Sequence, residues 1–394
     1  MKFIRFDSPS FQEELSPLLE RSSFNPDIDK SVAAIIADVK ARGDKALCDY
    51  ALRFDHAELT PAQFEVTAAE FAEAEALVPE NVKTAIRTAY AHIVAFSSQR
   101  IPQEWSFNPR AGVKEIFVVT PPGKDGGKVN PALLFACKTA GATKVYRLGG
   151  VYGVAALALG TETVPKVEKI VGPGNAYVTA AKRQLYGEVA LDLVAGPSEI
   201  MVVADKTANP AFIAADLLSQ AEHGSGFEQA VMVTTEPSLI DAVQQELAAQ
   251  SAKLSRLECV RKVLANGVFL ILAKDIDQAT DLAGKYAPEH LEMMTANPRE
   301  NAAKVRAAGA IFLGPWTPEP VGDFVAGPSH VLPTGGAARY FSGLTVEMFF
   351  RRTSLVEYSQ EALRDDLPHI ECFAKCEGLD GHGRSATIRR EEMR

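Results

Sequence analysis

The first hundred residues carry apolar side chains at helical spacing. One side of the predicted helices is formed by apolar residues at helical spacing: Ala33, Ile35, Ile36, Val39 and Leu47. A later stretch, residues 68–98, is rich in Ala, Glu and Val and is interrupted by Pro79. Because this spacing is that of one helix face, residues 9 to about 100 are predicted to be helical.

From residue 116 onward, short apolar runs alternate with helical patterns. The apolar runs predict strands at 116–119, 144–148, 169–171, 189–194, 199–204, 230–235, 268–272, 291–295 and 310–313. The segments between them predict helices at 131–140, 151–159, 176–185, 210–222, 237–253, 276–286 and 298–307. Strands separated by helices of this length are typical of parallel sheets that are covered on both faces.

The last eighty residues have a different pattern. Residues 314–343 are rich in Gly and Pro and nearly free of periodicity, and a loop that long inside a compact domain usually serves a function. In the polar tail from residue 365 we expect a helix before Cys372 and a short strand near 386–389.

The order of these elements predicts an α/β protein with two Rossmann-like parallel-sheet domains, an N-terminal helical segment and a small C-terminal tail domain. A chain of 394 residues exceeds what one hydrophobic core usually supports. The expected ranges, in that chain order, are 1–105 for the helical segment, 106–205 and 206–345 for the two sheet domains, and 346–394 for the tail.

Composition narrows the class of protein. The net charge of −9 argues against nucleic acid or an anionic membrane as the main partner. No uncharged apolar run is long enough to cross a bilayer, and the first residues lack the apolar core of a secretory signal. Five scattered cysteines fit reduced thiols. We therefore expect a cytoplasmic protein.

Two short segments offer groups for catalysis or metal binding. Gln220 and His223 are three apart at a predicted helix end, so both side chains leave one face; a histidine there is also an ordinary helix-terminal residue. Glu289 and His290 follow Pro288. They can serve one site only if the proline holds them in a turn before the strand begins, and the alternative is a surface pair.

Further candidates lie in loops. Asp323 and His330 fall in the long loop, where simple turn chemistry is an equal explanation, and Glu377 and His382 lie in the tail, which could also be plain surface. Two glycine turns, Gly172–Asn175 and Ala195–Glu199, could bind a phosphate or offer the hydroxyl of Ser198, although both could be structural.

Four of the seven histidines lie in these segments, together with an amide and two carboxylates. This concentration suggests one site with nitrogen and oxygen ligands for a borderline metal such as zinc.

Five of these segments, in this order, resemble the signature segments of the histidinol dehydrogenase family, and the similarity extends from about residue 1 to 390. They are Val171–Asn175, Ala195–Glu199, Gln220–His223, Ala287–Leu291 and Ser329–Thr334. The resemblance implies a zinc- and NAD-dependent, four-electron oxidation of L-histidinol through the aldehyde to L-histidine. It also implies a homodimer with shared active sites, in which the tail completes the site of the partner subunit.

Residue roles follow from the same resemblance. It implies Gln220, His223, Asp323 and His382 as zinc ligands and Glu289 and His290 as the acid–base pair. The residues implied to contact the substrate are Ser198, Gln220, His223, His290, Asp323, His330, Glu377 and His382. For the cofactor, Asn175 is retained.

The cofactor side departs from the family pattern. Between Phe107 and Ala111 a few dozen residues are missing, including a tyrosine that contacts NAD in the family. After Gly149-Gly150 the glutamine of the family is absent, and Tyr152 is a possible replacement. One hypothesis is an active dehydrogenase with a rebuilt NAD site around Asn175 and Tyr152. The other is a zinc-binding homologue without redox activity or with altered specificity, such as a paralogue that oxidises another amino or hydroxy alcohol.

Overall fold

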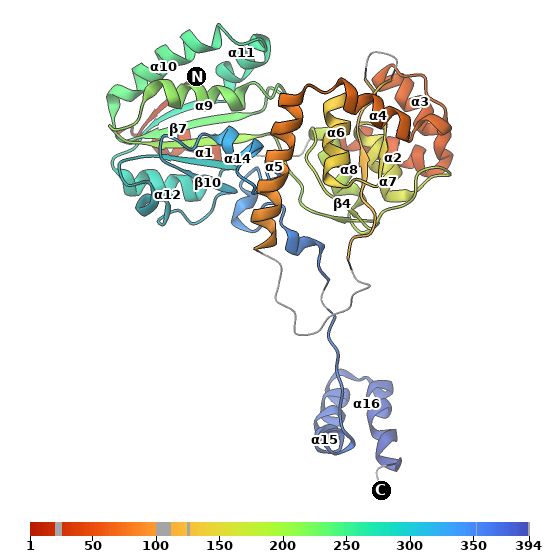
Figure 1. The fold of residues 1–394 in the computed structure, drawn as a ribbon. Helices are drawn as coiled ribbons and strands as arrows, with labels where there is room; N and C mark the ends of the chain where they lie inside the picture. Colours follow the sequence, from red (N-terminus) through yellow and green to blue (C-terminus); the bar gives the residue numbers. More distant parts are fainter. Residues whose placement is uncertain (20–25, 100–111, 124–126, 352, 393–394) are drawn as a thin grey trace. The chain divides into compact units, whose positions relative to one another are not determined.

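The computed structural model describes residues 1–19, 26–99, 112–123, 127–351 and 353–392. The chain forms two compact units, Met1–Phe349 and Phe350–Arg394, and has an α/β fold with parallel sheets (Figure 1). Among the described residues, no helix has the length and apolar character to cross a membrane.

A six-stranded parallel sheet carries the larger part of the first unit. Its order is β1 (Lys2–Arg5), β8 (Val268–Leu272), β7 (Gln229–Thr234), β6 (Glu199–Ala204), β9 (His290–Met294) and β10 (Ala310–Leu313). The four inner strands are buried along their whole length except at Gln229, the first residue of β7. Successive side chains of a strand point to opposite faces, so each face needs its own cover of helices.

Each face packs against a different set of helices (Figure 1). Ile200, Val202 and Met232 pack against α9 (Pro210–Ala221), α10 (Pro237–Ser251) and α11 (Leu257–Asn266). Met201, Val203 and Val231 pack against α1 (Phe11–Leu19) and α12 (Ile276–Tyr286), with α13 (Pro298–Ala302) beside β9 and β10. Successive side chains of β6 thus pack against helices on opposite faces of the sheet, and both faces are apolar, as is typical of a parallel strand buried on both sides.

A second group of elements in the first unit surrounds two small parallel sheets. One sheet pairs β2 (Phe117–Val119) with β3 (Lys144–Tyr146), and the other pairs β4 (Lys169–Ile170) with β5 (Ala190–Leu191). The helices around them are α2 (Pro26–Arg42), α3 (Asp44–Asp55), α4 (Ala68–Leu77), α5 (Glu80–Ser98), α6 (Pro131–Ala140), α7 (Gly150–Leu159) and α8 (Ala176–Leu185). Helix α7 is buried on almost every side. The predicted N-terminal helices α2 and α3 therefore share a core with α7 and α8.

Several predicted elements are corrected. The N-terminus begins with strand β1, and the strand at 199–204 belongs to the six-stranded sheet rather than with residues 106–205. The predicted strand at 189–194 is only the two residues of β5. The 314–343 loop contains helix α14 (Glu319–Phe324) and a short 3-10 turn at Ala337–Arg339, and another 3-10 turn at Val346–Phe349 follows the loop. Helix α11 was not predicted.

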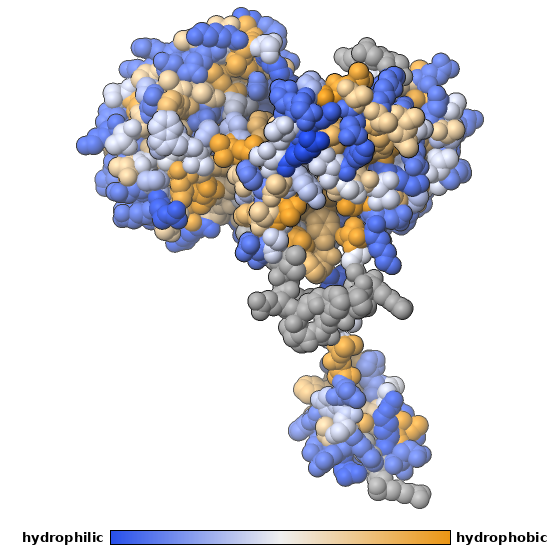
Figure 2. Space-filling model, viewed as in Figure 1, coloured by the Kyte–Doolittle hydropathy of each residue, from blue (hydrophilic) through white to orange (hydrophobic). Residues whose placement is uncertain are grey.

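The second unit consists of α15 (Gln360–Glu377), α16 (Asp380–Thr387) and a 3-10 turn at Ile388–Glu392. The hydroxyl of Ser359 accepts from Ala362 N at the start of α15, and Gly378 ends this helix in the left-handed conformation. The strand predicted near 386–389 is therefore wrong, because the helical turn that starts at Asp380 continues through these residues. Figure 2 shows apolar patches within the hydrophilic surface of both units.

Candidate active site

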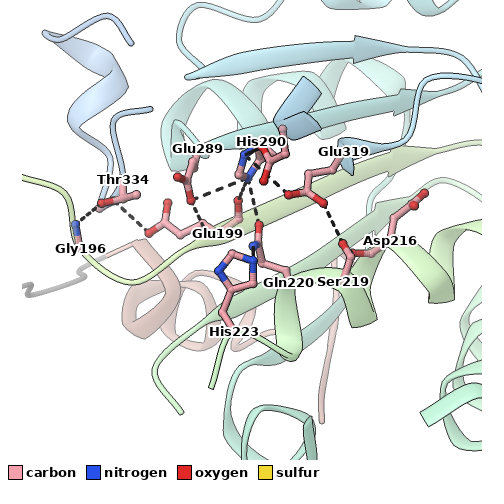
Figure 3. Close-up of polar contacts among 12 residues, drawn as sticks. Gly196, Glu199, Asp216, Ser219, Gln220, His223, Glu289, His290, Glu319 and Thr334 are labelled. Atoms are coloured by element: carbon pink, nitrogen blue, oxygen red, sulfur yellow. Dashed lines mark hydrogen bonds and ion pairs between the residues drawn. The ribbon is translucent and has the colours of Figure 1, made fainter. Parts of the chain in front are cut away.

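His290, the first residue of β9, is the centre of a buried polar cluster (Figure 3). Its Nδ1 lies 3.0 Å from both the carbonyl oxygen of Glu199 and the amide oxygen of Gln220. Both neighbours are acceptors, so Nδ1 carries a hydrogen. The imidazole is only 2% exposed, and its second nitrogen, Nε2, is left to face the rest of the site.

The Nε2 atom of His290 has no hydrogen-bond partner among the described residues, although it is buried. It lies 3.6 Å from Asp323 Oδ1 and 4.0 Å from Glu319 Oε1. Desolvation alone would lower the pKa of His290, but the close contact with Asp323 and the charges of Glu289, Glu319 and Asp323 outweigh it and raise the pKa to about 9. Without a bound cation the ring is therefore held in its charged form.

Glu289 reaches the same site from the preceding position. Ala287 has the left-handed φ of 51°, which ends α12 and turns the chain before Pro288. The Oε2 atom of Glu289 then accepts from Glu199 N at 2.9 Å and lies 3.7 Å from His290 Nδ1. Burial raises the pKa of Glu289 to about 8. The condition set by the sequence, a turn that lets both side chains serve one site, is thus met.

Gln220 and His223 approach from the end of α9. Gln220 is fully buried, and its Nε2 lies 3.3 Å from His223 Nε2. His223 follows the last turn of the helix and is exposed. The amide oxygen of Gln220 faces His290 rather than His223, so the amide must turn before the oxygen can join the His223 ring in binding one ion.

Asp323 is supplied by α14, which packs closely against β10. A Cβ at Gly322 would lie 2.5 Å from the Phe312 ring, so only glycine permits this approach. Burial raises the pKa of Asp323, but the neighbouring His290 ring outweighs burial and lowers it, so Asp323 stays ionised. Glu319, one turn earlier and 3% exposed, points its carboxylate at the same imidazole.

Three of these groups form a candidate cation site. The ligand atoms of His290, Glu319 and Asp323 all lie within 4.8 Å of one another, and this is the one such group that the described residues contain. Nitrogen and carboxylate donors suit zinc. The Nε2 atom of His290 has no hydrogen-bond partner in the described part of the chain, as expected of a group that contacts a metal or a substrate when one is bound. Glu319 was not predicted. Its signal is the spacing of four from Asp323, which is visible only once α14 is known to be helical.

The turn that contains Ser198 is hydrogen-bonded to residues of the 314–343 segment. Gly196 N donates to Thr334 Oγ1, and Gly335 N donates to Glu199 Oε1 at 3.0 Å. Ser198 is partly exposed beside the buried Glu199, and His330 is exposed. Ser198 directly precedes Glu199, whose carbonyl oxygen contacts His290 Nδ1, so its backbone lies beside the His290 cluster.

The two cofactor candidates have different surroundings. Asn175 is exposed at the start of α8, where its Oδ1 accepts from Tyr177 N and Val178 N at 3.0 and 3.1 Å. Tyr152 is 1% exposed in the core, and its hydroxyl donates to Asp55. The Tyr152 side chain is thus enclosed by protein, and its contact with a dinucleotide stays a prediction.

The turn before Asn175 is held by a buried ion pair. Lys182 and Asp192 contact each other, and their side chains are 4% and 0% exposed. Asp192 Oδ2 accepts from Gly172 N at 2.8 Å, and Lys182 Nζ donates to Gly172 O at 2.8 Å. Both backbone groups of Gly172 are therefore fixed by charged partners.

Two other candidates belong to the second unit, and one junction falls on residues that the structure does not describe. Glu377 and His382 are exposed residues of the second unit, and their role in a partner's site stays a prediction. The Phe107–Ala111 junction lies outside the described residues, which resume at residue 112.

Comparisons with known proteins identify the family. The profile of the histidinol dehydrogenase family matches residues 19–110 and 109–390. The chain is 39% identical over 414 residues to histidinol dehydrogenase of Heliobacterium mobile, covering 95% of this chain and 96% of that protein. It is also 39% identical over 432 residues to that of Cereibacter sphaeroides, covering 100% and 99%.

A solved structure agrees with this result. Histidinol dehydrogenase from Elizabethkingia anophelis superposes with a TM-score of 0.89 at 30% sequence identity, and the match covers 100% of this chain and 98% of the other. The profile and these relatives span nearly the whole chain, and the chain therefore belongs to the histidinol dehydrogenase family.

Proposed function

We propose that the chain oxidises L-histidinol through the aldehyde to L-histidine, with two NAD⁺ reduced in turn and one zinc ion per subunit. The observation that carries the proposal is the buried His290, with Gln220 on one ring nitrogen, Asp323 and Glu319 facing the other, and Glu289 adjacent. The carboxylates create a negative site for a substrate that carries an ammonium group.

The proposed ligands of the ion are Gln220, His223 and Asp323, with His382 from a second copy. A bound zinc ion would fix the amino alcohol through its nitrogen atoms and offset the nearby carboxylate charges. Ser198, His330 and, from the second copy, Glu377 would add contacts to the substrate.

His290 and Glu289 supply the proton transfers. Neutral His290 accepts the hydroxyl proton at Nε2 while Glu199 O and Gln220 hold Nδ1–H, which fixes the tautomer. Glu289, whose carboxylate accepts from Glu199 N, activates the water that hydrates the aldehyde. The burial of both groups excludes bulk water from the reacting atoms.

For the cofactor we retain Asn175 and the Gly172 turn. The alignment with the Cereibacter sphaeroides protein spans 432 positions, whereas this chain has 394 residues, so roughly three dozen positions lack a counterpart here. The two matched segments of the family profile meet at residues 109–110. This shortening, together with the buried Tyr152, supports a second candidate: a zinc-binding homologue with a reduced NAD site or altered specificity.

The deciding experiment combines purified protein with zinc, L-histidinol and NAD⁺ and follows NADH by absorbance. Turnover with two NADH per histidine supports the dehydrogenase. Binding of histidinol by calorimetry without NADH supports the second candidate.

A mixture experiment tests the proposed homodimer. Exposed Leu355, Val356 and Phe373 in the second unit support a partner there. His223→Ala mixed with His382→Ala should regain activity, because a mixed dimer holds one intact site. Failure to regain activity in a mixture shown to exchange subunits would contradict shared sites.

A further inference from the structure

A second, deeper level of buried acids lies behind the site. His290 and Glu292 are two apart on β9 and share a face, and Gln220 and Asp216 are one turn apart on α9. The outer level pairs His290 with Gln220. At the inner level Glu292 and Asp216 are neighbouring acids. These two acids are 1% and 7% exposed, and the proposed chemistry uses neither.

The inner level contacts the helix that carries Asp323. Glu292 Oε1 accepts from Glu319 N at 2.8 Å, at the first residue of α14. Ser219 of α9 adds a bond to Glu319 Oε2 at 3.0 Å. Because α14 has only six residues, fixing its first amide also fixes Asp323 in its next turn.

Holding this helix matters because none of the apolar side chains of α14 is completely buried. Two prolines, Pro318 and Pro320, flank its first residue, and its one completely buried side chain is Glu319. A carboxyl group in an apolar core costs free energy unless it is hydrogen-bonded. An apolar residue at position 292 would fill the same space but leave Glu319 N without an acceptor.

We propose that Glu292 is a positioning residue, which holds the first turn of α14 through Glu319 N and so keeps Asp323 at binding distance for the metal. The inference rests on the proposed zinc site. Residues of this kind, which orient a ligand without touching the ion, typically change metal affinity about 10- to 100-fold when removed.

Three variants test the positioning role. Glu292→Met keeps the length of the side chain but offers no acceptor to Glu319 N, and its zinc affinity should fall at least about tenfold. Glu292→Gln keeps an acceptor oxygen and should stay within about threefold of the wild type. Glu292→Asp keeps the acid but is one methylene shorter, so it should also bind zinc more weakly; it decides the matter if Glu292→Met does not fold.

The readouts are zinc affinity by chelator competition, KM for histidinol and the unfolding midpoint of the metal-free protein. Thr295→Val is the matched control, since it removes a buried bond from Asn301 near the other end of β9, away from α14. Its stability should fall and its zinc affinity should not. Wild-type zinc affinity in both Glu292→Met and Glu292→Asp overturns the inference. A wild-type protein that binds no zinc overturns the proposed site instead.

Discussion

Replacing Lys182 by Met tests the buried ion pair beneath the Gly172 turn. The change keeps most of the side-chain volume but removes the cation next to Asp192 and the bond from Nζ to Gly172 O. Removing one partner of a buried pair typically costs about 3–5 kcal/mol, because the other charge stays buried and unpaired. Asp192 keeps the amides of Gly172 and Leu193, at 2.8 and 2.6 Å. We therefore expect a loss of about 3 kcal/mol, at the lower end of this range.

The assay is urea unfolding monitored by circular dichroism, and the affinity for NAD⁺ is measured on the folded protein. In the double variant Lys182→Met/Asp192→Asn the unpaired charge is gone and an acceptor for Gly172 N remains, so about 1–2 kcal/mol should be recovered. Lys166→Met is the control: its pair with Glu188 is about half exposed, and the change should cost less than about 0.5 kcal/mol. The reasoning is refuted if Lys182→Met costs under about 1 kcal/mol, or if the double variant is as unstable as the single one.

Three further outcomes are expected. His290→Asn and Glu289→Gln should each lower kcat about 10²- to 10⁴-fold in steady-state NADH assays while the fold is retained by circular dichroism; normal kcat in either would exclude it from proton transfer. Chelation should abolish activity and lower the unfolding midpoint, and zinc, unlike Mg²⁺, should restore both, since a ligand at 100 times its Kd stabilises by about 2.7 kcal/mol. The pKa of His290 in the metal-free protein, about 9, lies above its ordinary value of 6.5, so its contribution to stability is complete below pH 6.5 and is lost as the pH rises through 9. The metal-free protein should thus lose up to about 3 kcal/mol over this interval, and a flat profile, or one that His290→Asn does not flatten, would contradict the origin in His290.

Much of the site could be predicted because its residues lie at the ends of regular elements. The apolar run of β9 and the helical pattern of α9 place His290 and Gln220 at element ends that a parallel fold brings together. Helix α14 was missed because Pro318, Pro320 and Gly322 erase the apolar periodicity of a six-residue helix. With it, Glu319 was missed as well.

Other errors arose where a pattern does not show which way a side chain points. Helix α7 is apolar all around, so its sequence could not indicate that Tyr152 faces the core and donates to Asp55. In the tail, Thr387 and Ile388 favoured a strand by their β-branched side chains, but the helix that starts at Asp380 extends to them.

The metal side and the cofactor side of the proposed site depend on different parts of the chain. His290, Gln220 and Asp323 are placed by β9, α9 and α14, and none of the described contacts of His290 involves residues before 199. Asn175 and the Gly172 turn are held by Lys182 and Asp192. The described contacts of His290 therefore all come from elements that follow the shortened region near residue 110 in the sequence. The affinities for histidinol and zinc should then equal those of full-length family members even if the affinity for NAD⁺ is reduced. Weak binding of histidinol, zinc and NAD⁺ alike would show that the metal side and the cofactor side are coupled.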